Sequence, residues 1–171
     1  TGRSSGRGRS RTEGQGPAKP KLQEPMTERC YISVPNDNPN PVIRMMETHM
    51  ARLGWRAQHL TWTRQNLVAR QGQISVVHLH WPEAFWRSSR VSFALARSLD
   101  FCDRVHVSRS LGYRVVWSAH NVMPHEYRWH RLETTMRLWL LRNVYLVVGH
   151  ARNCREELEA AFGPLEVPYL L

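Results

Sequence analysis

The chain has 171 residues, of which 42% are apolar, and it carries 24 Lys plus Arg against 14 Asp plus Glu, for a net charge of +10. One globular domain of this length buries most of its apolar surface without metal or disulfide staples, and three cysteines without close pairing indicate a reduced, intracellular protein. No run of about eighteen apolar residues exists, and no apolar stretch follows the basic N-terminus, so neither a membrane span nor a secretory signal is expected.

The first segment, residues 1–29, is rich in Gly, Ser, Arg and Pro and holds seven basic and three acidic groups. It buries too little surface to offset the entropy of ordering it, so we expect a disordered basic leader. The remaining charge of +6 comes from 17 Arg and 11 acids spread along the rest of the chain. Because no helix gathers its Arg on one face with interleaved aromatic residues, nucleic acid is not an expected partner.

From Cys30 onward, short β-rich runs alternate with helical periods. Strands are predicted over 30–34, about 55–62, 74–80, 114–119, 145–148 and 166–170. Helices are predicted from Pro41 to about Leu53, over much of 88–111, across 129–139 and across 154–162; in the longest of them, apolar residues recur at helical spacing at Val91, Leu95, Leu99, Cys102 and Val105. Alternation of this kind requires crossover connections, which give parallel strands with helices on both faces. The predicted fold is therefore α/β, a doubly wound, mostly parallel, Rossmann-like sheet over residues 30–171.

Ligands of such sheets bind beyond the carboxyl ends of the strands. The residues that follow the predicted strands are 36–40, 80–86, 120–126 and 150–153. None of these loops carries a Gly-rich phosphate-binding motif, so a self-sufficient nucleotide-binding domain is disfavoured. An Asp-x-Asp pair is absent as well, which argues against an enzyme that holds Mg²⁺ or Mn²⁺ through clustered carboxylates.

Three histidines raise the question of a metal site. His78 and His80 lie two apart on a strand and therefore share one face, with His120 as a conceivable third ligand. Alternate positions on a buried strand also accommodate core histidines that bind no metal, and no Cys or acidic residue is spaced to complete the site. The sequence therefore predicts no bound metal.

His120 and Asn121 directly follow an apolar strand, so the imidazole is expected at the carboxyl edge of the sheet. There it can hydrogen-bond a hydroxyl or titrate near neutral pH. The alternative is a histidine that only caps the neighbouring loop.

Glu83 lies in a loop among aromatic residues, namely Trp81, Phe85 and Trp86. Aromatic faces beside a carboxylate suit a sugar, which stacks its C–H face on a ring while its hydroxyls are hydrogen-bonded. The alternative is a hydrophobic plug over the sheet edge with a solvated Glu83. For Glu126, at the start of a helix, a role at the helix dipole is the simpler interpretation.

Three phrases, Val-Val-His-Leu-His-Trp-Pro-Glu at 76–83, Val-Val-Trp-Ser-Ala-His-Asn-Val-Met-Pro-His-Glu at 115–126 and Val-Val-Gly-His-Ala at 147–151, together resemble the N-terminal half of bacterial GT-B glycosyltransferases. The nearest subgroup comprises the nucleotide-sugar-dependent enzymes of polysaccharide assembly. The loop Asn38-Pro39-Asn40-Pro41 resembles the Asn-Pro loop of that group, and Phe162-Gly163 resembles the point where its sixth strand begins.

The resemblance implies a two-domain enzyme in which this half binds a glycan or lipid-linked acceptor and a following half binds the nucleotide-sugar donor. By position, His120 is the catalytic residue beside the transferred sugar, and the loop Asn38, Pro39 and Asn40 faces the donor diphosphate. The implied acceptor-binding residues are His80, Trp81, Glu83, Asn121 and His125. Backbone N–H groups and basic side chains stabilise the leaving diphosphate, so no metal and no cofactor besides the nucleotide sugar is expected.

Relatives continue from the region of Leu171 into the donor-binding domain, so this chain alone is not expected to transfer sugar. A non-catalytic binding or remnant module on the same fold is the alternative function. The resemblance implies a cytoplasmic protein, with contact to the inner face of the membrane as an added hypothesis. The candidates for that contact are Arg128, Arg131, Arg137 and Arg142 beside Trp129 and Trp139; a helix with a solvated basic face explains them equally well.

Overall fold

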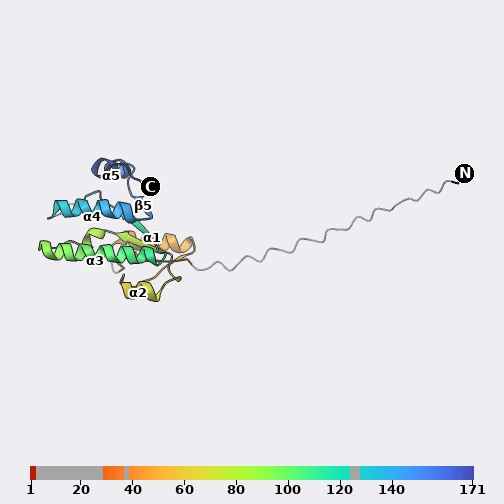
Figure 1. Cartoon of the computed structure of the whole chain (residues 1–171), viewed down its shortest axis with the longest axis horizontal. Coiled ribbons are helices and arrows are strands. Elements are labelled where there is room, and N and C mark those ends of the chain that lie inside the picture. The colour runs from red at the N-terminus through yellow and green to blue at the C-terminus, as the bar shows by residue number, and fades with distance from the viewer. Residues whose placement is uncertain (3–28, 37–38, 124–127) are drawn as a thin grey trace.

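The computed structural model describes residues 1–2, 29–36, 39–123 and 128–171 (Figure 1). The leader expected over residues 1–29 lies almost entirely outside these residues. Its predicted disorder therefore stays a prediction.

A six-stranded, all-parallel sheet with the order β2-β1-β3-β4-β5-β6 forms the centre of the molecule. The strands are β1 (Arg29–Val34), β2 (Trp55–Ala57), β3 (Val76–His80), β4 (Arg114–Ala119), β5 (Leu146–Gly149) and β6 (Tyr169–Leu170). The chain moves outward from β1 to β2 and then returns to β3 on the other side of β1, so the strand order reverses between β1 and β3. The α/β, doubly wound, Rossmann-like prediction is confirmed.

The connections between strands are helical. They are α1 (Pro41–Arg52), α2 (Arg64–Ala69), the 3₁₀ helix η1 (Pro82–Phe85), α3 (Val91–Ser110), α4 (His130–Asn143) and α5 (Cys154–Phe162). Helices α2, α3, α4 and α5 follow one another across the molecule in that order (Figure 1). These four helices all contribute buried residues to the core on one face of the sheet, for example Leu67 of α2 and Leu158 of α5. The buried Ile43 of α1 does not belong to that core.

The strand predicted over 55–62 ends early, at Ala57. The N–H of Gln58 still donates to the Tyr31 carbonyl at 2.8 Å, but the chain then leaves the sheet. The reason is Trp62, whose indole turns into the core and donates from Nε1 to Ser108 Oγ at 3.1 Å. Thr63 then caps α2, a helix that the sequence analysis did not predict.

The last strand is also shorter than predicted, because β6 covers only Tyr169–Leu170 instead of 166–170. Pro168 has no N–H to donate to a sheet ladder, which delays pairing until Tyr169. Its carbonyl does accept a hydrogen bond from the N–H of Val147, at 2.9 Å.

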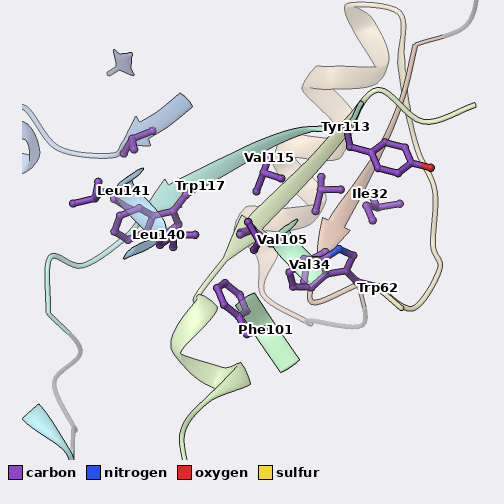
Figure 2. Packing of buried hydrophobic residues seen from close by; sticks show 14 of the residues in the cluster. Ile32, Val34, Trp62, Phe101, Val105, Tyr113, Val115, Trp117, Leu140 and Leu141 are labelled. Atoms are coloured by element: carbon purple, nitrogen blue, oxygen red, sulfur yellow. The ribbon is translucent and has the colours of Figure 1, made fainter. Parts of the chain in front are cut away.

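Helix α3 is unbroken, but its inward face differs from the apolar spacing in the sequence. The buried side chains include Ala94, Ser98, Phe101 and Val105. Val91, Leu95 and Leu99 are exposed, Leu99 to 72%. Phe101 selects this rotation, because it packs edge-on against both Trp62 and Trp86. Figure 2 shows Phe101 and Val105 beneath the sheet residues that they cover.

Alternating residues of each strand divide between the two faces of the sheet. One face carries the core, with Val34, Val115 and Trp117 packed against α3 and α4 (Figure 2). The other face carries polar side chains near the carboxyl ends of the central strands, at Ser33, His78, His80 and Ser118. This polar face leads directly to the candidate site.

Candidate functional site

The carboxyl ends of β3, β4 and β5 bring four ring-bearing residues together. His80 is the last residue of β3 and Trp81 follows it, whereas His120 and His150 directly follow β4 and β5. Because Ala119 pairs with Gly149 in the parallel register, the two histidines that come next are also neighbours. The sheet edge predicted to hold the site therefore carries a contiguous group of rings.

The imidazole of His120 lies between two stacked rings. The Trp81 indole covers one face, with centroids 4.3 Å apart and planes inclined by 10°, and His150 covers the other, at 4.2 Å and 7°. In addition, Nε2 of His120 lies 3.2 Å from Nδ1 of His80, within hydrogen-bond distance. These three contacts fix both the plane and the rotation of the His120 ring.

The backbone at Trp81 is strained. Its φ of 43° lies in the left-handed region, and Trp81 is the one non-glycine residue with positive φ in the described part of the chain. Such a conformation costs about 1–2 kcal/mol for a residue with a Cβ. Pro82 then starts η1 with its fixed φ, and the strained turn directs the indole back over His120.

His78 extends the row of imidazoles along β3. Its ring centroid lies 4.2 Å from that of His80, and its Nε2 is 2.8 Å from Ser118 Oγ on β4. The four imidazoles of His78, His80, His120 and His150 therefore form a continuous row across three strands, which we call the histidine row.

Burial and mutual repulsion keep the histidine row neutral. Burial, with His120 and His150 as the next causes, lowers the pKa of His78 to about 4. Burial and the neighbouring His150 lower the pKa of His120 to about 4, and the pKa of the fully buried His80 is lowered further still. None of the four makes an ion pair with a described carboxylate. At pH 7 each ring therefore has one N–H donor and one nitrogen lone pair.

Arg137 of α4 ties the two loops beside the histidine row to the helix. Its guanidinium donates to Glu133 at 2.8 Å, to Glu83 at 3.3 Å and to the carbonyl of Asn121 at 3.2 Å. It also lies over the Trp117 ring, 5.6 Å from the centroid. One buried cation therefore joins the β3 loop, the β4 loop and α4.

This placement corrects one expectation for Arg137. Its position beside other arginines in the sequence predicts a candidate for membrane contact, but Arg137 is only 1% exposed. It faces inward because Glu83 and Glu133 are themselves buried and need a cationic partner. Arg128, Arg131 and Arg142 are exposed, as that hypothesis requires.

The remaining predicted site residues are only partly brought together. Glu83 and Asn121 line the same shallow hollow as Trp81 and His120, but the Glu83 carboxylate is bound by Arg137. Asn40 caps α1, its Oδ1 accepting from the N–H of Val42 at 2.9 Å, and the neighbouring Pro39 is exposed. Two predicted positions, Asn38 and His125, lie outside the described residues.

His150 belongs to the site although the sequence analysis does not select it. It stands within the range 150–153 predicted to follow a strand, yet the selected residues all follow β1, β3 or β4. The signal is present, because His120 and His150 are each the first residue after a buried parallel strand. A larger hollow of about 350 Å³, lined by Leu141, Phe162 and Val167 among others, lies at the opposite edge, away from these histidines.

Three further findings concern the described residues as a whole. The described residues include no group of three or more His, Cys, Asp or Glu side chains arranged to hold a metal ion. Within the same part of the chain, every helix is too short or too polar to cross a bilayer. All three cysteines, Cys30, Cys102 and Cys154, are free.

The chain matches no protein-family model and no curated protein. Its likeness to the GT-B glycosyltransferases therefore depends on the motifs quoted above.

Proposed function

We propose that this chain is the acceptor-side domain of a GT-B-type glycosyltransferase. In this account a separate donor-binding half holds the nucleotide sugar, and the sugar passes to a glycan or lipid-linked acceptor at the carboxyl edge of the sheet without a metal. The observation that supports the proposal is the clamped ring of His120, which follows β4 and is held by Trp81, His150 and His80.

The chemistry available at this edge fits a sugar. An indole presents an apolar face, and a neutral imidazole exchanges hydrogen bonds with hydroxyl groups. His120 is half-buried, so it meets solvent while its ring stays fixed. A fixed ring orients a bound hydroxyl without a further loss of conformational entropy at the moment of reaction.

The leaving diphosphate needs positive charge or N–H donors. Helix α1 begins at Pro41, in the loop that follows β1, so its N-terminus lies on the same edge as the histidines. The dipole of α1 favours an anion at this end, although the N–H groups of Val42 and Ile43 are already bonded to Asn40. This supports the loop Asn38, Pro39 and Asn40 as the part of the domain that faces the donor diphosphate.

One observation favours the alternative, a non-catalytic binding module. The carboxylate of Glu83 is buried and bound by Arg137, so in this arrangement it is not free to take a proton from an acceptor hydroxyl. Stacking on Trp81 and a hydrogen bond to His120 would be enough for binding alone. The two functions therefore differ in whether bound sugar acceptor becomes glycosylated.

The test is labelled-sugar transfer by this chain reconstituted with a candidate donor-binding half. We expect His120→Ala to lower transfer about 100-fold, the scale of the rate lost when a group that positions the reactants is removed. His106→Ala is the matched control, because His106 is exposed and distant from the row. Binding without transfer would support the binding module. Absence of transfer to every glycan or lipid-linked acceptor, with acceptor binding unaffected by His120→Ala, would contradict both.

Peripheral membrane contact and a cytoplasmic location are part of the same proposal. The exposed side chains of Arg128, Arg131 and Arg142 support membrane contact. Trp129 supports it less, because its indole is half-buried and its N–H donates to the Ser88 carbonyl at 3.1 Å. Flotation with anionic vesicles tests the idea. We expect co-flotation that is lost when all three arginines are changed to Gln, and protein left entirely unbound would remove the proposal.

A further inference from the structure

The contact between His80 and His120 requires one nitrogen to donate and the other to accept. Nδ1 of His80 and Nε2 of His120 are 3.2 Å apart, and both rings are neutral at pH 7. A neutral imidazole has a proton on only one of its two nitrogens. Whichever ring donates therefore determines the tautomer of both.

The surroundings of His80 decide between the two arrangements. Its side chain is 1% exposed, and its other nitrogen, Nε2, is buried without a hydrogen-bond partner among the described residues. If His120 donated, His80 would have to carry its proton on that nitrogen, as a buried N–H with no acceptor. Buried N–H groups without an acceptor are rare in folded proteins, whereas buried acceptors without a donor occur more often. An unprotonated Nε2 on His80 is therefore the favoured arrangement.

We infer that His80 is a positioning residue that donates its Nδ1–H to Nε2 of His120 and so keeps the proton of His120 on Nδ1. Trp81 and His150 prevent the ring from tilting, because they cover both of its faces. No hydrogen bond among the described residues uses Nδ1 of His120. The site therefore presents a fixed N–H donor at the sheet edge.

A fixed donor selects the chemistry of its ligand. The atom that meets Nδ1 of His120 is an acceptor oxygen, either of a sugar hydroxyl or of a phosphate group. In its resting state this nitrogen cannot take a proton from a hydroxyl, so His120 binds and orients rather than acting as a base there. This identification of the ligand atom rests on the proposed function, whereas the tautomer does not.

The experiment is a long-range ¹H–¹⁵N correlation spectrum of the full chain with ¹⁵N-labelled histidine at pH 7. In the wild-type protein we expect Nδ1 of His120 at the chemical shift of a protonated ring nitrogen and Nε2 at that of an unprotonated one. His80→Asn places an amide N–H near the former Nδ1, so it should preserve this pattern. His80→Leu removes the donor, and the His120 signals should move toward a mixture of both tautomers.

His78→Gln is the matched control, because His78 lies on the same strand but makes no hydrogen bond to His120. A wild-type His120 protonated on Nε2 would overturn the inference, and so would an unchanged pattern in folded His80→Leu. Should His80→Leu fail to fold, the wild-type and His80→Asn spectra still decide the question. The measurement needs no sugar transfer, so failure of the glycosyltransferase proposal would leave its result intact.

Discussion

The Trp81 indole and the His120 imidazole lie in planes only 10° apart, with ring centroids separated by 4.3 Å. Trp81 follows β3 and His120 follows β4, and the stack forms because Trp81 adopts a left-handed backbone directly after its strand. The strained backbone at Trp81 is therefore accompanied by a stacking contact that holds the indole in place. Substitutions at Trp81 can test whether the backbone is strained.

Trp81→Gly is expected to be more stable than Trp81→Ala. Both variants lose the indole, but only glycine adopts a φ of 43° without steric cost. The expected difference is about 0.5–1 kcal/mol in the free energy of unfolding, after allowing for the greater freedom of glycine in the unfolded chain. Urea denaturation of the two variants measures it. An alanine variant that is as stable as the glycine variant would show that the turn is not strained.

Gly149→Ala is expected to lower the free energy of unfolding by about 1–3 kcal/mol, the range for overpacking a buried position. A Cβ at this position would overlap Oη of Tyr169, so the Tyr169 side chain, which is half-buried against β5, must move. Tyr169→Ala removes the obstacle, and the double variant should lose less stability than the sum of the two single variants. Additive losses in urea denaturation would argue against this contact.

Arg137→Met is expected to destabilise the fold by about 3–5 kcal/mol, because it leaves the buried Glu83 and Glu133 carboxylates without a cation. Changing both of these glutamates to Gln in the same variant should recover most of the loss. The exposed Arg142→Met serves as control and should stay within about 0.5 kcal/mol of wild type. Thermal or urea unfolding in which Arg137→Met behaves like this control would refute a structural role for the buried ion pairs.

Stability is expected to fall as the pH decreases from about 6.5 toward 4. The pKa values of His78 and His120 are about 4 in the folded protein, against an ordinary histidine pKa of 6.5 in the unfolded chain, so the unfolded chain binds protons first over this window. We expect the Tm to drop by at least about 4 °C between pH 7 and pH 5, at about 2–4 °C per kcal/mol for a domain of this size.

His106→Asn, which alters an exposed histidine, should leave this pH profile unchanged, whereas His78→Asn should flatten it. A Tm that stays constant between pH 7 and pH 5 would contradict the lowered pKa values of His78 and His120 in the folded protein. Above about pH 8 these imidazoles are neutral in both the folded and the unfolded chain, so their contribution to the pH dependence should vanish there.

The sequence is sufficient to predict the order of most elements and the sheet edge at which the candidate residues meet. Strand β4 is predicted over 114–119 and spans those residues. A run of β-branched and aromatic residues bounded by Gly112 and a polar loop favours a strand of this length. The meeting of His80 and His120 follows from the same reasoning, since the ends of neighbouring parallel strands lie together.

Features that depend on distant partners could not be read from local patterns. The inward face of α3 is set by Phe101 against Trp62 and Trp86, not by the stripe of Leu95 and Leu99. Arg137 resembles a surface cation in the sequence, and its partner Glu83 lies 54 positions away. His150 follows β5 as His120 follows β4, so its place at this edge could be read from the sequence, whereas the stacking of the two rings depends on how the side chains are held.

The proposed function requires a sugar acceptor to bind against the His120 ring, which is held between Trp81 and His150. The most direct measurement is a titration of the ¹⁵N-histidine-labelled chain with candidate glycan and lipid-linked acceptors, read at the ring signals of His120 and His106. Binding at the proposed edge predicts a saturable shift at His120, its loss in Trp81→Ala, and no movement at His106. Acceptors that bind the chain while the His120 signals stay in place would contradict the account.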